Sequence, residues 1–559
     1  MNQNMRPIEI TKTLLKEHGI RYVVVSPGGT NMSLVRALQD DPFFTLYSIV
    51  DERSAIYFAI GLYLQTGEII ATSCTSAQAT RNYIPGLTEA FYKRVPLLAI
   101  TMEKHPSFIG QEYMQAPDQT SMPKDCIKNS YEVPYIATIQ DEYACIRIVN
   151  EAICELTNKG CGPVQLCIPW IDFFIKETTP NIRSISRYTR YDNSFDLNGK
   201  QIMIVIGEHR PFTDTQIQAL EKFAENTDCV IYNNHLSNYA GKYSVNANLE
   251  FTVTNINEFE KKYAPDLLIS IGGQTGDYPF FLLLSKPELS RTEHWRIAED
   301  GKIIDTYDKL TKVFECSIES FFEAAAGNAP AEHNYFQKFD ALCSSTDRDV
   351  DLPFSNAFAA QTLHDKLPKN SIVQFSILNS LRVWNLFDLD PSIECYSNVG
   401  AFGIDGGMST LIGQSVVTDK LCFMIIGDLA FYYDMNSLGI RHIKNNVRIL
   451  LINNNGGVEF KLYDGNHQKT DQYIAAAGHF KEAKGWAESS NFKYMSASTK
   501  EEFLNRYAEF INTSEKPILF ELFVTDKNEY LGYQKLLDAN RDIDIKEKLK
   551  KGIKKFIGK

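Results

Sequence analysis

Long apolar runs, paired cysteines and an excess of basic charge are all missing from this sequence of 559 residues. No run approaches the roughly 18 apolar residues that a membrane-spanning helix needs, and the opening MNQNMRPIEITK has no apolar core of a secretory leader. None of the eleven cysteines forms a CxxC pair, so reduced, buried thiols are expected rather than a zinc or disulfide framework. The net charge of −12 argues against nucleic acid, which would require a basic face. These absences predict a cytoplasmic protein with neither a membrane nor a nucleic-acid partner.

The chain is too long for a single hydrophobic core and suggests three domains of roughly 150–200 residues each. Short apolar runs such as YVVVS (22–26), QIMIVIG (201–207) and VRILLINNN (447–455) alternate with helical periods. This alternation predicts an α/β fold of three doubly wound parallel sheets. Polar stretches at 176–198 and around 343–352 interrupt the rhythm and are expected to be linkers. The predicted domains are therefore 1–180, 195–342 and 353–559.

The most informative segment is residues 421–457, where one apolar strand ends at Gly427-Asp428 and a second ends in the run NNNGG. A helix is expected to cross over between these two strands. In a parallel sheet both strand ends emerge at the same carboxyl edge, where ligands bind in open α/β folds. The Asp428 carboxylate, the Asn455 amide oxygen and the Gly457 carbonyl would supply three hard oxygen ligands for Mg²⁺, and a bound diphosphate would supply most of the others. Gly427 and the following helix suit the close approach of an anion.

This segment resembles the signature of thiamine-diphosphate enzymes. Within that superfamily the chain is most similar to the 2-succinyl-5-enolpyruvyl-6-hydroxy-3-cyclohexene-1-carboxylate synthases, the decarboxylating carboligases of menaquinone synthesis. The resemblance also includes SPGGTNMSL (26–34), DERSAIYFAIGL (51–62), CTSAQATRNYIPGLTEAFYKRVPLLAIT (74–101), NSLRVW (379–384) and NVGAFGIDGGMST (398–410). It implies a pyrimidine-binding domain, a central domain and a domain that binds diphosphate and Mg²⁺, in that order.

The resemblance also assigns roles to individual residues. Glu52 matches the glutamate that bonds the pyrimidine nitrogen, so that the cofactor's own imino group can remove the proton from thiazolium C2. The alternative is a surface Asp-Glu-Arg triplet in which Asp51 caps a helix. Ile404 matches the apolar residue that holds the cofactor bent, and Gln115 matches a glutamine over the reacting carbon or is a plain surface residue. The cofactor-binding set is completed by Pro27, Asn82, Gly403, Gly427, Asp428, Leu429, Ala430, Asn455 and Gly457.

The substrate positions differ from the family pattern. Arginines that would clamp two polyanionic substrates are replaced by Thr30, Trp384 and Val399, and the basic pair expected within 272–279 is missing from GGQTGDYP. Each lost clamp removes a charged hydrogen bond worth about 1.5–3 kcal/mol. Trp384 would line an apolar or sugar-stacking wall, or else pack in the core. The expected substrate residues are Thr30, Asn31, Ser380, Trp384 and Val399.

We therefore predict that the enzyme decarboxylates a 2-oxo acid and transfers the resulting fragment to a carbonyl or enone acceptor less anionic than isochorismate. No two histidines are adjacent, which favours carboligation over simple release of an aldehyde, and the central domain contains no flavin motif. The alternatives are a simple decarboxylase, oxidase or acetolactate-synthase-like enzyme, a true menaquinone-pathway synthase, and an inactive regulatory paralogue. The resemblance further implies a homodimer or homotetramer with its active sites at the subunit interface.

Overall fold

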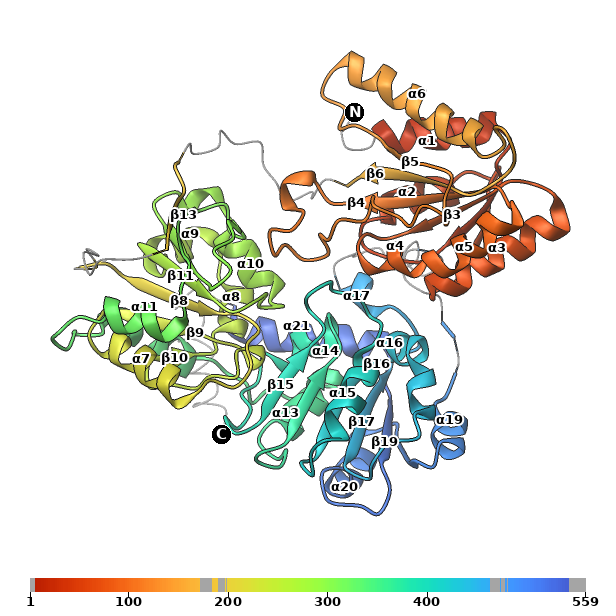
Figure 1. Cartoon of the computed structure of the whole chain (residues 1–559). Coiled ribbons are helices and arrows are strands. Elements are labelled where there is room, and N and C mark those ends of the chain that lie inside the picture. The colour runs from red at the N-terminus through yellow and green to blue at the C-terminus, as the bar shows by residue number, and fades with distance from the viewer. Residues whose placement is uncertain are drawn as a thin grey trace, which may run out of the picture.

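Three separate sheets, each built only of parallel strands, organise the chain (Figure 1). The computed structural model describes residues 6–170, 183–189, 197, 199–462, 473, 478–479 and 481–541. The predicted α/β class with three parallel sheets is confirmed. The carboxyl edge of the third sheet, which bears α16 and α17, faces the first domain (Figure 1).

The first domain contains a six-stranded sheet in the order β2-β1-β3-β4-β6-β5. One face packs against α1, α2 and α6, and the other against α3 and α5. The apolar runs form strands because their side chains are buried on both faces. The elements are α1 (Arg6–Glu17), β1 (Tyr22–Val25), α2 (Met32–Gln39), β2 (Thr45–Ser48), α3 (Glu52–Thr66), β3 (Ile70–Cys74), α4 (Gln78–Asn82), α5 (Ile84–Lys93), β4 (Leu97–Glu103), η2 (Pro106–Phe108), β5 (Ser130–Glu132), α6 (Ile139–Glu155) and β6 (Val164–Pro169).

The central domain has a seven-stranded sheet in the order β10-β9-β8-β11-β12-β13-β7. Its strand order reverses between β8 and β11, which makes the carboxyl end of that pair the switch point of the sheet. The elements are β7 (Ser186–Tyr188), β8 (Ile202–Ile206), α7 (Asp214–Glu225), β9 (Cys229–Tyr232), η3 (His235–Ser237), β10 (Ser244–Val245), α8 (Asn248–Val253), α9 (Ile256–Lys262), β11 (Leu267–Ile271), α10 (Tyr278–Leu284), η4 (Pro287–Leu289), β12 (Glu293–Ile297), β13 (Leu310–Phe314), α11 (Ile318–Ala325) and α12 (Asn334–Ser344).

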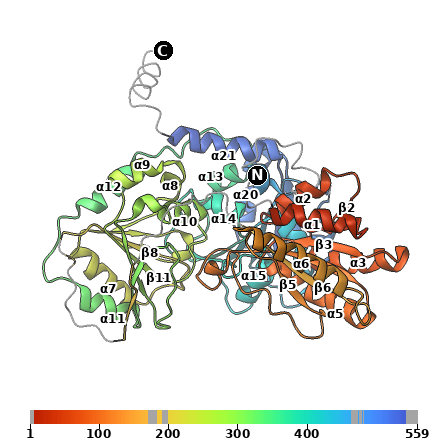
Figure 2. The ribbon, with the colours of Figure 1, turned by 90° about the horizontal axis from the view of Figure 1, so that it is seen from above.

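The third domain has a six-stranded sheet in the order β15-β14-β16-β17-β19-β18. The C-terminal helix α21 contacts α8 of the central domain as well as α13 and α17, and so joins the two domains (Figure 2). The elements are α13 (Asn356–Leu363), β14 (Ile372–Phe375), α14 (Asn379–Trp384), β15 (Glu394–Ser397), α15 (Gly407–Ser415), β16 (Cys422–Gly427), α16 (Asp428–Tyr433), η5 (Met435–Gly439), β17 (Val447–Asn453), α17 (Val458–Lys461), α19 (Lys484–Ser489), β18 (Lys493–Ala497), α20 (Lys500–Phe510), β19 (Ile518–Phe523) and α21 (Asp526–Asn540).

Two expectations about local structure require correction. The stretch 176–198, predicted to be a linker, contains β7, which pairs with β13 at the edge of the central sheet, so that sheet begins before residue 195; most of the remaining stretch lies outside the described residues. The helix expected to cross from Asp428 to the next strand is only six residues long and is followed by the 3₁₀ helix η5. The α-helix ends at Tyr433, and the carboxylate of the next residue, Asp434, bonds to Ser409.

All eleven cysteines are free thiols and seven of them are buried, whereas the expected burial is wrong for Cys154, which is exposed, and for Cys161, Cys316 and Cys343, which are half-buried. Within the described ranges, no helix is long and apolar enough to cross a membrane.

Candidate functional site

Glu52 occupies the first turn of α3 and is only 7% exposed. The alternative, a surface Asp-Glu-Arg triplet, describes its two neighbours correctly. The Asp51 side chain caps the helix by accepting from Ser54 N–H, and the exposed Arg53 pairs with Asp51. Glu52 itself does not fit that alternative. Burial raises the pKa of its carboxyl to about 7, and a hydrogen bond from Tyr433 opposes part of that rise. The carboxyl can therefore gain or lose a proton at neutral pH.

The bond to Glu52 comes from the third domain of the same chain. The Tyr433 hydroxyl, at the end of α16, donates to Glu52 Oε2 at 2.7 Å. The same short helix begins with Asp428, one of the predicted metal ligands. Glu52 of the first domain and the Asp428 loop of the third domain thus lie at opposite ends of α16.

The loop after β17 folds back onto Asp428, as the parallel pairing of β16 and β17 predicts. Asp428 is 2% exposed. Its Oδ2 accepts from Gly456 N–H at 3.1 Å and its Oδ1 from Leu429 N–H at 2.7 Å. Asn455 has a φ of +66°, a left-handed conformation that turns the chain sharply at this point, and Gly457 immediately precedes α17.

His479 links the two halves of this loop. Its backbone N–H donates to Asn455 Oδ1 at 2.9 Å, and its ring Nε2 lies 3.2 Å from Asp428 Oδ2, although the ring is turned too far for a hydrogen bond. The ring Nδ1 accepts from Lys481 N–H at 2.9 Å. A neutral ring with Nδ1 occupied in this way carries its proton on Nε2.

Another buried carboxyl, that of Glu529 in α21, supports the carboxyl edge of the third sheet. It accepts from Asn356 N–H at 2.7 Å and from Asn379 Nδ2 at 3.4 Å. Burial is the main cause that raises the pKa of Glu529 to about 7, and the nearby charge of Asp428 adds to the rise. The N-terminal ends of α13 and α14 are thus both fixed to the C-terminal helix.

Thr30 and Asn31, two predicted substrate residues, hold their own loop together. The Thr30 hydroxyl lies 2.7 Å from Thr75 Oγ1 and accepts from Ser76 N–H at 3.0 Å. The Asn31 amide donates to Ser26 O at 3.0 Å. Gly28 permits the close approach, since a Cβ there would lie 2.3 Å from the Thr75 side chain. Both predicted residues are buried in this contact.

Trp384, for which a substrate wall and the core were both considered, and the candidate substrate residue Val399 both lie in the core. Each is fully buried in the core shared by the central and third domains. The Trp384 indole N–H donates to Asn356 Oδ1 at 3.1 Å, so the core alternative holds. Ser380, in the same helix, is 5% exposed. Arg382 of that helix has its guanidinium bound by Glu459, with two N···O distances of 2.7 Å.

The other predicted cofactor residues lie around these groups. Ile404 is half-buried and packs against both cores of the third domain. Gly403 approaches Gln78 closely, since a Cβ there would lie 2.9 Å from its side chain. Pro27 lies two residues after β1, Asn82 ends α4, and Leu429 and Ala430 form the first turn of α16 behind Gly427.

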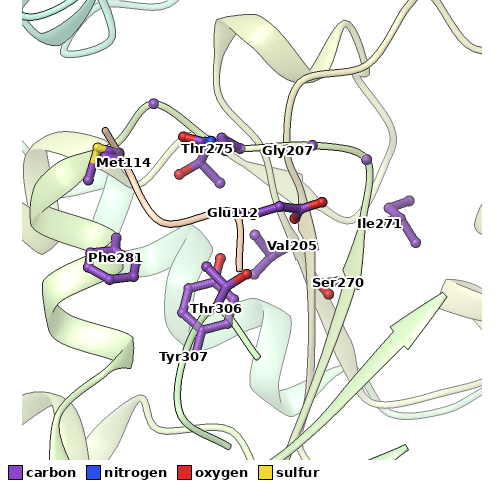
Figure 3. Close-up of a pocket in the computed structure, with 14 residues that line it drawn as sticks. Glu112, Met114, Val205, Gly207, Ser270, Ile271, Thr275, Phe281, Thr306 and Tyr307 are labelled. Carbon is purple, nitrogen blue, oxygen red and sulfur yellow. The ribbon is translucent and has the colours of Figure 1, made fainter. Parts of the chain in front are cut away.

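A separate hollow of about 450 Å³, partly open to solvent, lies at the switch point of the central sheet (Figure 3). Glu112 and Met114 reach it from the first-domain loop that also carries Gln115, and the turn 272–276 closes one side. This turn replaces the basic pair of the family pattern. Its Gln274 amide donates to Gly400 O at 3.1 Å, in the loop that carries Val399 and Ile404. Gln115 itself has a φ of +58° and is half-buried.

The chain is similar to known proteins over nearly its whole length. Residues 8–122 match the model of the thiamine pyrophosphate enzyme N-terminal TPP binding domain. The 2-succinyl-5-enolpyruvyl-6-hydroxy-3-cyclohexene-1-carboxylate synthase of Phocaeicola vulgatus is 35% identical over 542 residues, covering 92% of this chain and 95% of that protein. The chain belongs to this synthase family. Family members of the same name from Bacteroides thetaiotaomicron and Flavobacterium psychrophilum are 33% and 30% identical, with 92% and 93% of this chain and 95% of each relative covered.

Membership of this family implies thiamine diphosphate, and the residues present fit that group. Asp428 is a buried carboxylate, and within the described residues no lysine or arginine lies within ion-pair distance of it. A buried, uncompensated anion is costly and favours a bound cation. The neighbouring Asn454 Oδ1 is also buried and has no hydrogen-bond partner in the part of the chain that the structure describes. Throughout the described chain, no three His, Cys, Asp or Glu side chains cluster as a metal site on their own.

Sequence reasoning missed three side chains in this family site: Tyr433, His479 and Glu529. Tyr433 lies in a helix read only as a crossover, and its partner Glu52 is 381 positions away. His479 has no recognisable sequence spacing from Asp428 or Asn455. Glu529 is in the first turn of α21, where an acidic residue is usually a solvated complement to the helix dipole. Only the tertiary contacts separate these residues from ordinary surface groups.

Proposed function

We propose that this thiamine-diphosphate enzyme uses Mg²⁺, decarboxylates a 2-oxo acid and joins the remaining fragment to an acceptor carbonyl or enone. The observation that carries the proposal is the pair of buried carboxyls linked by α16. Glu52 has a pKa of about 7 and faces the third domain, whereas Asp428 lies in a loop suited to a cation. Two carboxyls with such different surroundings can perform two different tasks.

Each side chain has a defined part in this proposal. Asp428, Asn455 and the Gly457 carbonyl hold the Mg²⁺, which in turn binds the diphosphate. Glu52 holds a proton at the pyrimidine nitrogen, because its carboxyl is buried and titrates near neutrality. Ile404 supplies an apolar surface that keeps the bound molecule bent. When bound, thiamine diphosphate supplies the nucleophilic carbon and the electron sink, and the protein supplies orientation and a dry site.

The proposed acceptor is less anionic than isochorismate. At the positions that separate this chain from the family pattern, Thr30 bonds to Thr75 and Trp384 is a core residue. Arg382 does not replace the missing clamps, since its guanidinium is already bound by Glu459. The second candidate is the menaquinone-pathway reaction, which is favoured by the shared name of the three relatives.

The test is a screen of 2-oxo acids with purified protein, thiamine diphosphate and Mg²⁺, scored by carbon dioxide release and by mass spectrometry of the products. We expect release from at least one acid, and a ligated product when a neutral aldehyde, ketone or enone acceptor is added. Robust turnover of 2-oxoglutarate with isochorismate would establish the second candidate instead. Release of free aldehyde regardless of acceptor would indicate a simple decarboxylase, and cofactor binding without turnover an inactive paralogue.

We also propose that the active unit is a homodimer or a dimer of dimers. Helix α3, which begins at Glu52, exposes Tyr57, Phe58 and Leu64 with 46, 38 and 65% of their surface accessible, and Tyr92 of α5 is 68% exposed. Large apolar side chains gathered on two neighbouring helices are typical of a protein interface. Sedimentation velocity should give at least twice the chain mass of 63.5 kDa. A monomer that retains full activity would contradict this proposal.

A further inference from the structure

Helix α16 connects every part of the candidate site within six residues. Asp428 begins it, and the ring of Tyr432 packs edge-on against His479 with centroids 4.9 Å apart. Tyr433 bonds Glu52. Just beyond the helix, the Asp434 carboxylate accepts from Ser409 N–H and Oγ–H at 2.9 Å each.

We propose that Tyr433 is a positioning residue that fixes the Glu52 carboxyl, and that α16 is anchored at both ends to keep the Tyr433 hydroxyl in place. The role assigned to Glu52 rests on the proposed function; the positioning itself does not. The Tyr433 hydroxyl bonds Oε2, and the backbone N–H of Glu52 is a second donor to the same carboxyl. The carboxyl is thus presented in one orientation before any ligand arrives.

The titratable groups around Glu52 show why the Tyr433 side chain is the group that fixes its carboxyl. The other titratable groups that face it are Asp51 from the start of its own helix, Asp405 from the loop before α15, and Cys74 and Tyr83 from the β3 side. Within the described structure no cation bonds this carboxyl. The negative charges of Asp51 and Asp405 disfavour its ionised form, and the Tyr433 hydroxyl favours it.

The helix itself has little freedom to rotate. Phe431 is fully buried in the core of the third domain, and Ala430 is 6% exposed beside it. The Asp428 carboxylate is held by two backbone N–H groups at one end, and Asp434 is held by α15 at the other. Turning the Tyr433 hydroxyl away from Glu52 would break contacts at both ends.

The sharpest test measures Glu52 without any cofactor. In protein carrying ¹³C-labelled glutamate carboxyls, the Glu52 signal is assigned by its loss in Glu52→Gln and then titrated. We expect Tyr433→Phe to raise its midpoint by about one pH unit, because the donor that stabilises the carboxylate is gone. Tyr432→Phe is the matched control: it makes the same change one residue earlier, and the Tyr432 hydroxyl has no hydrogen-bond partner among the described residues.

A second measurement uses the protein loaded with thiamine diphosphate and Mg²⁺. Exchange of the cofactor C2 proton with deuterium should slow about tenfold at neutral pH in Tyr433→Phe, with cofactor affinity changed less than twofold. If the Glu52 midpoint is the same in Tyr433→Phe and Tyr432→Phe, the positioning role is wrong, whatever the change in thermal stability. If the midpoint shifts but loaded protein shows no C2 exchange in any variant, the positioning stands and the proposed function fails.

Discussion

Replacing Glu52 by glutamine is expected to lower the rate of carbon dioxide release by about 10²- to 10⁴-fold, the usual contribution of a positioned acid–base group. The amide keeps the size and the burial of the side chain but cannot hold or release a proton. Steady-state assays with the best 2-oxo acid of the screen measure the effect. When these assays are repeated across a range of pH, the pH–rate profile of Glu52→Gln should lack the ionisation near pH 7 that Glu52 supplies.

Glu89→Gln provides the control for this variant. Glu89 lies on α5 of the same domain, is 45% exposed and forms an exposed ion pair with Lys93 one turn away, so its loss should leave activity within twofold of the original protein. Full activity in Glu52→Gln would show that another group performs the proton transfer. A folded Glu52→Gln protein that still binds cofactor would exclude simple unfolding as the cause of its inactivity.

Replacing Asp428 by alanine is expected to weaken Mg²⁺-dependent binding of thiamine diphosphate by more than about 100-fold, since even a residue that only orients a metal ligand typically contributes 10- to 100-fold. The change removes the buried anion that accepts from Gly456 and Leu429. Isothermal titration of the cofactor at several Mg²⁺ concentrations measures it. His479→Phe should give an intermediate loss of about tenfold, because it removes the ring nitrogen that lies 3.2 Å from Asp428 Oδ2.

The control is Asp419→Ala, which removes a fully exposed aspartate just before β16. Asp419→Ala should bind thiamine diphosphate and Mg²⁺ with the same affinity as the unchanged protein. Tight binding of thiamine diphosphate by Asp428→Ala in the absence of divalent cations would refute the metal site. Equal affinities in His479→Phe and the original protein would show that the ring does not orient Asp428.

The parallel architecture could be predicted because its strands are continuous apolar runs. Runs such as those at 22–26 and 447–455 are buried on both faces, and this is the pattern that a doubly wound sheet imposes. The proximity of Asp428 to the asparagine loop followed from strand order alone, since neighbouring parallel strands end at one edge. These features depend on local pattern and topology.

The side chains that complete the site could not be predicted in this way. Tyr433 and His479 acquire their partners only when segments distant in sequence meet, and neither has a residue type or spacing that indicates a role. Trp384 and Val399 show the converse. Their departure from a family pattern was visible in the sequence, but whether the side chains reach a pocket or the core depends on the packing of two domains.

The strand order of the third sheet also determines when this protein can begin to work during its synthesis. β19 is among the last strands to leave the ribosome, yet it lies between β17 and β18, and Glu529 just after it fixes the start of α13. Domains fold as units, the N-terminal one first. The domain that carries Glu52 is complete by Pro169, long before the edge that it faces. A nascent chain shorter than 518 residues therefore carries Glu52 in a finished domain, while Asp428 still lacks the strand that completes its sheet.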